Sequence, residues 1–186
     1  MDAPITIRQL PGPALSEPLL AQVDAIFFEA SGRTFVPGPE RDAFRERWLG
    51  RYLRGGTDVV LLALSGPGAM GGTVAGYLVG AIESPAEQER FADISYFRDD
   101  FADLVRRFPA HLHINLAPAF RSRGIGARLV EAFARRAADS GAGGVHVVTG
   151  VGLRNVGFYE RCGFFPRATA IWNGRSIVFL GRDLQR

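Results

Sequence analysis

The sequence predicts a single α/β domain over residues 1–186, with a mixed, mostly antiparallel β-sheet flanked by helices. Three observations predict this class. The chain has 186 residues and a mass of 20.2 kDa, the size of one large domain. It is 47% apolar and 22% charged, which is ordinary globular usage and excludes extensive disorder. Short strand-like runs alternate with amphipathic helix-like segments along the chain.

The first third of the chain predicts one strand and two helices. Ile5 to Leu10 has the pattern of a short strand, and prolines then interrupt the chain. Leu19 to Ala30 predicts an amphipathic helix, and Glu40 to Leu53 predicts a second one. The second helix carries aromatic residues four positions apart on one face, which we interpret as core packing rather than a ligand surface: Phe44, Trp48 and Tyr52.

The middle of the chain predicts a hairpin followed by a charged segment. Asp58 to Leu64 and Thr73 to Ile82 are strand-like and are joined by the glycine-rich stretch Gly66 to Gly72. Residues 83–108 combine charges with four aromatic residues: Phe91, Tyr96, Phe97 and Phe101. This pattern fits a helical lid or acceptor-binding element, and it fits equally a solvated helix with one buried face.

The last part of the chain predicts alternating strands and helices that end in a hairpin. The strands are His111 to Leu116 and Val145 to Val151, and the helices are Ile125 to Ser140 and Gly157 to Cys162. The hairpin joins Ala168–Trp172 to Ser176–Leu180 through Asn173-Gly174, a strong signal for a two-residue turn.

Composition excludes several classes of protein. A single cysteine excludes a disulfide scaffold and a thiolate zinc cluster, and with no signal-peptide pattern it predicts a cytoplasmic protein. No stretch approaches about 18 apolar residues, so we expect no membrane-spanning helix. All 22 basic residues are arginines, but a scattered net charge of +3 is weak support for nucleic-acid binding, and we expect none.

A basic, glycine-containing turn between a predicted strand and a predicted helix is the sharpest local feature. The free amides at a helix N-terminus attract anions, and Gly124 and Gly126 leave that backbone uncovered. Arg121 and Arg123 add positive charge, so the turn fits a phosphate or pyrophosphate cradle as well as it fits an ordinary connection. A P-loop needs a lysine, which this chain lacks. The dinucleotide fingerprint needs glycine where Leu129 stands.

Two motifs in order resemble those of the GNAT acetyltransferases. Residues 121–126, Arg-Ser-Arg-Gly-Ile-Gly, resemble the R/Q-x-x-G-x-G/A signature of the family, and Leu116-Ala117-Pro118 fits the hydrophobic-x-Pro that precedes it. Residues 158–164, Phe-Tyr-Glu-Arg-Cys-Gly-Phe, resemble the family's F-Y-x-x-x-G-F. This similarity covers about Leu112 to Phe165. A narrower resemblance links Pro109–Ile114 and Arg45–Tyr52 to bacterial relatives of the acetyltransferase-like domain of O-GlcNAcase.

The resemblance implies acetyl transfer from acetyl-CoA to a small-molecule or peptide amine, by direct attack in a ternary complex. It implies that amides from about Ser122 to Ala127 hold the pyrophosphate and that the amide of Leu116, or one nearby, polarises the thioester carbonyl. Tyr159 matches the family tyrosine that protonates the leaving thiolate. The residues expected to contact the co-substrate are Leu116, Arg121, Ser122, Arg123, Gly124, Ile125, Gly126, Ala127, Asn155 and Phe158.

One position departs from the family pattern. The family often carries asparagine six residues before the Phe of F-Y, where this chain has Gly152. Asn155 stands three residues before Phe158, so whether it replaces the usual contact is open at this point.

Histidines on the strand before the turn are candidates for the general base. His111, His113 and Asn115 share one face of that strand, and His113 is the first choice because histidine titrates near neutrality. A hydrogen-bonded structural histidine fits equally well. His111, His113 and His146 lack an acidic or thiolate partner nearby in sequence, so we expect no metal site, and we interpret Cys162 as buried packing.

Two other functional classes compete with this interpretation. A non-catalytic acyl-CoA-binding or regulatory module would keep the 121–126 turn and lack turnover. A nucleic-acid-binding domain would show a steep salt dependence. A monomer and a homodimer are both compatible with the sequence.

Overall fold

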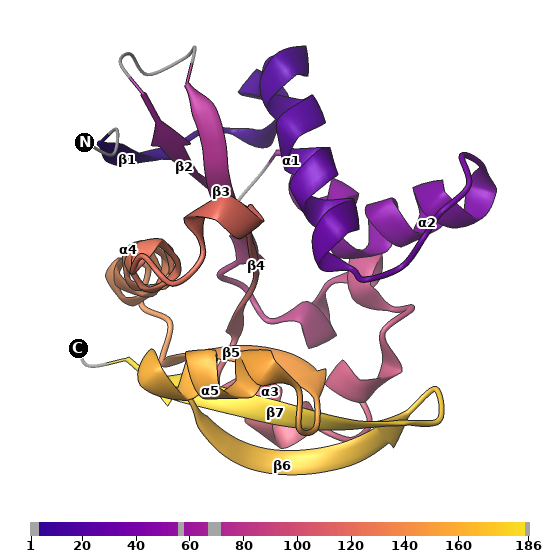
Figure 1. Ribbon diagram of the computed structural model, residues 1–186. Coiled ribbons are helices and arrows are strands. Elements are labelled where there is room, and N and C mark those ends of the chain that lie inside the picture. The colour runs from indigo at the N-terminus through magenta and orange to yellow at the C-terminus, as the bar shows by residue number, and fades with distance from the viewer. Residues whose placement is uncertain (1–3, 56–57, 67–71, 185–186) are drawn as a thin grey trace. The chain divides into compact units, whose positions relative to one another are not determined.

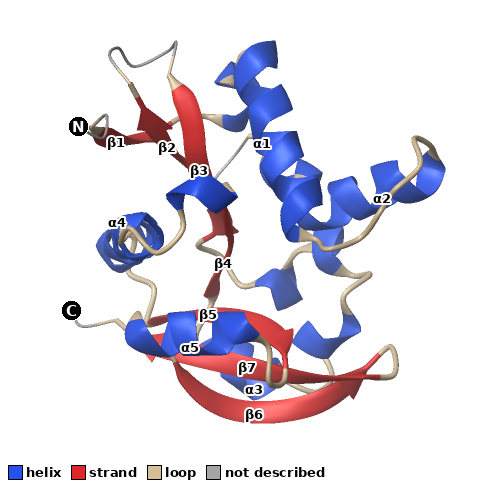
Figure 2. Cartoon of the chain, viewed as in Figure 1, coloured by secondary structure: helices blue, strands red, loops and turns tan. Residues whose placement is uncertain are grey.

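The computed structural model describes residues 4–55, 58–66 and 72–184, and it confirms the predicted fold class. Seven strands form one mixed sheet in the order β1-β2-β3-β4-β5-β7-β6 (Figure 1). The β1–β2, β2–β3, β5–β7 and β6–β7 pairs are antiparallel, and β4 and β5 pair in parallel. Helices accompany these strands, as the colouring by secondary structure shows (Figure 2). The linker at Gly66–Gly72 lies largely outside the described residues.

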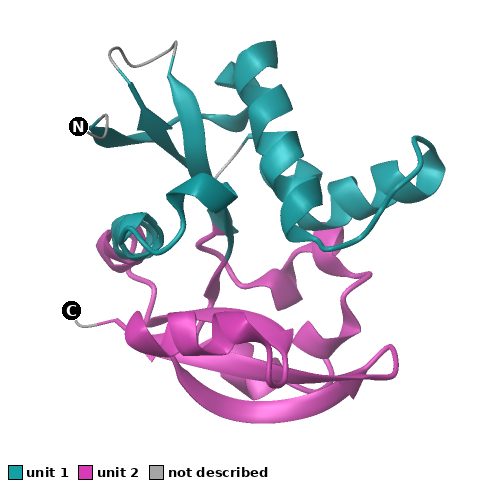
Figure 3. Ribbon diagram, in the orientation of Figure 1, with its two compact units in different colours: residues 1–80, 113–133 teal, residues 81–112, 134–186 magenta. Residues whose placement is uncertain are grey.

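The chain divides into two compact units, coloured separately in Figure 3. Unit 1 comprises residues 1–80 and 113–133, and unit 2 comprises residues 81–112 and 134–186. The boundary falls within β4 (Ala110–Leu116) and within α4 (Ile125–Asp139), so each unit contains part of both elements.

In unit 1, α1 (Glu17–Ala30) packs beside an antiparallel ladder of β1 (Ile5–Gln9), β2 (Val59–Ser65) and β3 (Thr73–Ala81). The buried residues of α1 recur every three or four positions, which gives the helix one apolar face: Leu19, Val23, Ile26 and Phe27. The Gln22 side chain ties α1 to β3, because its Oε1 accepts a hydrogen bond from the Val74 amide at 2.8 Å.

The second predicted helix ends earlier than the sequence suggests. Helix α2 spans Pro39–Trp48, and the chain leaves helical geometry at Leu49, where φ is −138° and ψ is −55°. A 3₁₀ turn, η2 (Gly50–Tyr52), follows. The break buries both Leu49 and Tyr52 completely, so the energy of tertiary burial overrides the helical periodicity that predicted a continuation to Leu53.

In unit 2, residues 83–108 form the short turns η3 (Pro85–Glu87), η4 (Glu89–Phe91) and η5 (Ser95–Phe97) and the six-residue helix α3 (Ala102–Arg107). The solvated helix with one buried face, one of the two interpretations of this segment, is therefore wrong. Its aromatic side chains are buried and belong to the core of unit 2: Phe91, Tyr96, Phe97 and Phe101. Burial of these rings holds a segment that has little regular structure of its own.

The remaining elements of unit 2 are β5 (Gly144–Gly150), α5 (Arg154–Arg161), β6 (Phe165–Trp172) and β7 (Arg175–Asp183). The hairpin predicted at Asn173-Gly174 is confirmed, with φ values of 50° and 72° at the two turn residues. Positive φ at both positions is the geometry that two-residue hairpin turns require. None of the helices within the described ranges has the length and apolar character needed to cross a membrane.

Candidate active site

The turn before α4 has the backbone geometry of an anion cradle. Ser122 and Gly124 both adopt left-handed conformations, with φ of 61° and 74°. Alternating backbone handedness of this kind turns successive amides toward one side, which forms a concave site for an anion. Residues 121–124 are all exposed, so these amides are accessible. The amides of the first turn of α4 add to them, because they have no acceptor within the helix.

Space at Gly124 supports the same interpretation. A Cβ placed on Gly124 would have no atom within 4 Å, so no neighbour excludes a side chain there. Its positive φ is what favours glycine, and the open space above it leaves room for a ligand against the backbone.

Arg121 connects this turn to the end of β4. Its Nε donates a hydrogen bond to the carbonyl oxygen of Leu116 at 3.0 Å. Arg123 follows Arg121 by two residues, and its guanidinium carbon is 5.6 Å from the centre of the Phe120 ring. Both guanidinium groups therefore belong to exposed residues next to the left-handed turn, where they raise the local positive potential.

The backbone of Leu116 is oriented away from β3. The amide of Ala117 donates to the carbonyl of Ala75 at 3.0 Å, which marks these two residues as a hydrogen-bonded pair. Successive residues of an extended strand direct their amide and carbonyl groups to opposite sides. The amide of Leu116 thus points away from β3, on the side where Arg121 already binds the Leu116 carbonyl.

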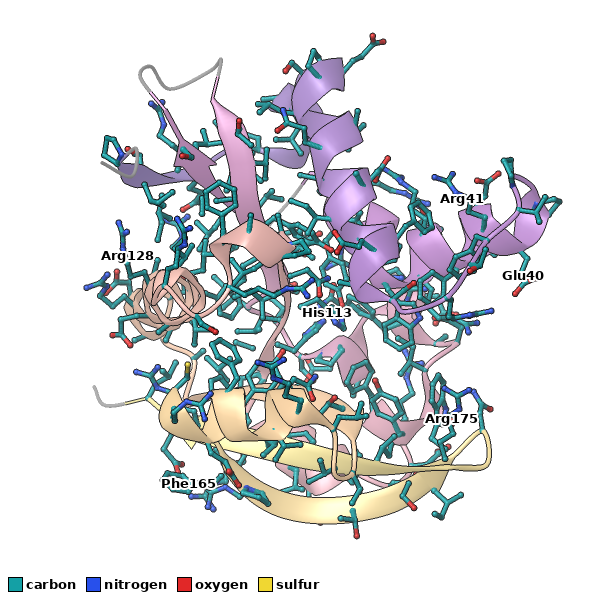
Figure 4. All side chains as sticks on the ribbon, in the orientation of Figure 1. Glu40, Arg41, His113, Arg128, Phe165 and Arg175 are labelled. Atoms are coloured by element: carbon teal, nitrogen blue, oxygen red, sulfur yellow. The ribbon has the colours of Figure 1, made fainter. Side chains whose placement is uncertain are left out.

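His113 packs against two aromatic residues, Trp48 at the end of α2 and Tyr52 in η2. Its Nε2 lies 3.1 Å from the Tyr52 hydroxyl. The rings of Trp48 and Tyr52 meet it edge-on, with centroids at 5.5 and 5.4 Å. Burial, with a smaller contribution from the positive charge of Arg51, lowers the pKa of His113 to about 4. His113, labelled beside β4 in Figure 4, is therefore neutral at physiological pH.

A second tyrosine binds the next residue on the same face of β4. Asn115 donates a hydrogen bond from Nδ2 to the Tyr77 hydroxyl at 2.8 Å. Burial is the largest contribution that raises the pKa of Tyr77. His113 and Asn115 are thus each fixed by a buried tyrosine, one from η2 and one from β3.

In unit 2, α5 buries Tyr159 against its own helix and the following turn. The Tyr159 ring lies 5.2 Å from the Phe158 ring and 5.7 Å from the Phe164 ring, measured between centroids. Burial raises the pKa of Tyr159, and the nearby Cys162 raises it further. Tyr159 is therefore a neutral phenol across the physiological pH range and can act as a proton donor.

The comparison with protein families decides the assignment. The model of the acetyltransferase (GNAT) family matches residues 24–164, more than half of the chain. The chain belongs to the GNAT acetyltransferase family.

Solved structures agree with the GNAT fold. A protein named SsHAT superposes with a TM-score of 0.69 at 20% identity, over 97% of this chain and 100% of that one. A structure from Desulfovibrio desulfuricans, described as a GNAT-family acetyltransferase, gives 0.67 at 17% identity over 98% and 100%. Arabidopsis thaliana NAA60, solved in complex with acetyl-CoA, gives 0.65 at 15% identity over 97% and 99%. At these identities the likeness shows the fold.

The departure from the GNAT pattern at Gly152 has a backbone explanation. Gly152 adopts a φ of +74°, and a Cβ there would meet nothing within 4 Å. Asn155 lies in the first turn of α5, where its Nδ2 donates to the Thr149 Oγ1 on β5 at 2.9 Å. The Asn155 side chain is exposed and held in place by β5, so it is available to a ligand.

The other histidines and Cys162 lie apart from these groups. His111 and His146 are buried in unit 2 with their rings stacked at 5.5 Å, and His146 also stacks on Phe179 at 4.6 Å. Within residues 4–55, 58–66 and 72–184, no group of three or more His, Cys, Asp or Glu could hold a metal. Cys162 is partly buried, and its carbonyl accepts a hydrogen bond from Arg182 at 3.2 Å.

The structure places the predicted site residues of this GNAT protein in both units. Unit 1 holds His113, Leu116 and residues 121–127, whereas unit 2 holds Asn155, Phe158 and Tyr159. Sequence reasoning missed Tyr52 and Tyr77 as partners of the β4 face. The four-residue spacing of Trp48 and Tyr52 placed both on one surface, but it did not indicate that this surface meets His113.

Proposed function

We propose that this protein transfers an acetyl group from acetyl-CoA to a primary amine, by direct attack within a ternary complex. Membership of the GNAT family supports acetyl transfer in general. The left-handed turn at Ser122 and Gly124 is the observation that carries the choice of co-substrate, because it offers open, positively flanked backbone amides to a pyrophosphate. A GNAT-fold neighbour at TM-score 0.65 was solved with acetyl-CoA.

The residues of unit 1 fit this co-substrate. The amides from Ser122 to Ala127 would hold the pyrophosphate, with Arg121 and Arg123 supplying charge. The amide of Leu116, which points away from β3, would donate to the thioester carbonyl and stabilise negative charge that develops on its oxygen. When bound, acetyl-CoA supplies the activated acetyl group. Asn155 and Phe158 are the residues of unit 2 that we expect to contact it.

Tyr159 donates a hydrogen bond to the leaving sulfur. Its raised pKa keeps the hydroxyl protonated, so that it can stabilise the departing thiolate as a hydrogen-bond donor. Because a thiol has an ordinary pKa of about 8.5, below that of this phenol, complete transfer of the phenolic proton to the thiolate is unfavourable. Packing against Phe158 and Phe164 also holds the ring, and with it the phenolic oxygen, in one position.

His113 limits the form in which the acceptor reacts. An alkylammonium has a pKa of about 10.4, roughly six units above that of His113, so direct transfer from the ammonium to His113 is unfavourable by about a million-fold. The amine therefore attacks in its neutral form. The proton that the nitrogen then loses goes either to His113 or to water, and the tautomer of His113 decides between them.

Thermal unfolding with and without acetyl-CoA tests the co-substrate site. At about 100 times the dissociation constant, a ligand adds about 2.7 kcal/mol, which raises the melting temperature of a domain this size by roughly 5–10 °C. Gly124→Glu should abolish the rise, because it places a negative side chain in the open cradle. Gly174→Glu is the matched control: its φ of +72° and open surroundings equal those of Gly124, but it lies in the β6–β7 turn.

Initial-rate kinetics with primary amines then test transfer itself. Release of free coenzyme A thiol, with rates that depend on both substrates in an intersecting pattern, would support direct attack. A melting-temperature rise without thiol release for any primary amine would favour the alternative, a non-catalytic acyl-CoA-binding module. No rise in the wild-type protein would contradict the proposed function as a whole.

The remaining finer assignments stay predictions. They are a small-molecule or peptide amine as acceptor, no nucleic-acid or membrane partner, a monomer or homodimer, and a cytoplasmic location. The narrower kinship with bacterial relatives of the O-GlcNAcase domain also stays a prediction, carried by Pro109–Ile114 and Arg45–Tyr52 alone.

A further inference from the structure

We propose that Tyr52 is a positioning residue that donates its hydroxyl proton to Nε2 of His113, and so fixes His113 as the tautomer with hydrogen on Nδ1. In this state His113 can donate a hydrogen bond to the acceptor but cannot take a proton from it. The functional consequence rests on the proposed acetyl transfer, whereas the tautomer itself is a property of the free protein.

The geometry brings the two groups together in one defined way. The hydroxyl of Tyr52 and Nε2 of His113 are 3.1 Å apart, within hydrogen-bonding distance. Tyr52 is fully buried, whereas His113 is partly exposed, so Tyr52 acts through His113 rather than on a substrate directly. Among the residues that the structure describes, Nδ1 of His113 has no hydrogen-bond partner, and it is the nitrogen left for a ligand.

The direction of the hydrogen bond follows from the chemistry of the two groups. A neutral imidazole has one protonated and one unprotonated nitrogen, and its partner selects which is which. A phenol is the stronger donor, since it loses a proton far more readily than a neutral imidazole does. The unprotonated imidazole nitrogen is the stronger acceptor, since it binds a proton at ordinary pKa values. Donation from Tyr52 to Nε2 is therefore favoured over the reverse.

The surroundings keep His113 in the neutral state that this arrangement needs. The aromatic edges of Trp48 and Tyr52 pack against the imidazole and restrict its rotation. The positive charge of Arg51 disfavours a positive charge on the nearby His113 imidazole. Three residues within the sequence Trp48-Leu49-Gly50-Arg51-Tyr52 thus set the orientation, charge and tautomer of one histidine on β4.

The consequence for the reaction concerns the proton of the attacking nitrogen. With hydrogen on Nδ1 and a hydrogen bond at Nε2, His113 has no lone pair free to accept that proton, so water receives it. His113 instead donates a hydrogen bond from Nδ1 to an atom of the acceptor substrate that carries a lone pair. If Tyr52 accepted a hydrogen bond from Nε2–H, the lone pair of Nδ1 would be free and His113 would be the general base.

Nitrogen-15 NMR of the free protein, labelled at histidine, distinguishes the two states. The chain has three histidines, so His113 is assigned by the signal lost in His113→Gln. We expect hydrogen on Nδ1 and none on Nε2 at pH 7. A dominant Nε2–H tautomer of His113 in the wild-type protein would overturn the proposal.

Tyr52→Phe tests whether the hydroxyl is the cause. It should shift the population toward the Nε2–H tautomer and raise the His113 pKa above its value of about 4, because a hydrogen bond to the neutral form is lost. Tyr77→Phe is the matched control: it removes another buried hydroxyl on the same face of β4, bound to Asn115, and should leave His113 unchanged.

The outcomes separate this inference from the proposed function. An unchanged tautomer or a lowered pKa in Tyr52→Phe would overturn the role of Tyr52, whatever the enzymatic result. An Nδ1–H tautomer that responds to Tyr52→Phe supports that role, even if the protein transfers no acetyl group and the proposed function fails.

Discussion

Gly76 on β3 lies directly against Leu116 on β4, with no room between the strands for a side chain. A Cβ on Gly76 would overlap with Cδ2 of Leu116 and lie 2.8 Å from the carbonyl oxygen of Asn115. The side chain of Leu116 could move aside, but the backbone carbonyl could do so only by displacing β4. This close approach fixes the end of β4 that carries Asn115 and the proposed oxyanion donor, the amide of Leu116.

We expect Gly76→Ala to destabilise the protein by about 1–3 kcal/mol, since an added methyl group in a filled space forces the backbone to shift. It should also weaken acetyl-CoA binding by displacing the amide of Leu116. Denaturant unfolding and calorimetric titration measure the two effects. Gly157→Ala is the control: its Cβ would meet only the end of the Arg161 side chain, at 3.6 Å, and alanine should stabilise helix α5. Equal stability of Gly76→Ala and the wild type would contradict the close approach.

Tyr159→Phe is expected to lower kcat by about 10²–10⁴-fold, the usual contribution of a positioned acid, with little change in the KM for acetyl-CoA. The ring and its packing against Phe158 and Phe164 are kept, so the melting temperature should stay close to that of the wild type. Tyr96→Phe removes a hydroxyl from another buried tyrosine of unit 2 and should retain kcat. A Tyr159→Phe enzyme with wild-type turnover at every pH would remove Tyr159 from the mechanism.

Stability should depend on pH through His113. Its pKa of about 4 in the folded protein lies below the ordinary value of 6.5, so between these values the unfolded chain binds a proton that the folded protein does not. The free energy of unfolding should therefore fall as the pH drops from about 6.5 to about 4. We expect His113→Asn to lose less stability over this window than the wild type does. Parallel curves for the two proteins, from urea unfolding at each pH, would show that His113 is not responsible.

Local sequence signals predicted the parts of the fold that depend on local geometry. The Asn173-Gly174 turn needs positive φ at both residues, and asparagine and glycine are the residues that tolerate it. Gly124 and Gly126 were located in the 121–126 turn as residues that leave its backbone uncovered, but the left-handed conformations of Ser122 and Gly124 were not predicted. Helix α4 was predicted almost to the residue, because its apolar spacing matches its burial against the sheet.

Tertiary packing determined what the sequence could not predict. The pattern of residues 83–108 fitted a helix, but burial of Phe91, Tyr96 and their neighbours sets the path of this segment instead. Tyr52 and His113 are 61 positions apart in the chain, so no spacing rule connects them. The motif residues of the site could be found one by one, whereas the partners that set their charge and tautomer required the folded structure.

Asn155 provides the last test, because it addresses the position at which this chain departs from the family pattern. Its amide is fixed on Thr149 at 2.9 Å and is exposed in the first turn of α5. If it contacts acetyl-CoA in place of the asparagine missing at Gly152, Asn155→Ala should weaken binding by about 2–10-fold, the worth of one hydrogen bond.

Thr149→Val separates contact from positioning. It leaves Asn155 present but removes the oxygen that holds its amide, so the loss of affinity should be smaller than in Asn155→Ala. Calorimetric titration gives the dissociation constants, and urea unfolding measures the stability of both variants. Asn155→Ala should keep wild-type stability within about 0.5 kcal/mol, as expected for an exposed side chain. An unchanged dissociation constant in Asn155→Ala would mean that the family contact is absent from this protein, and that the cradle at residues 121–127 binds the co-substrate without it.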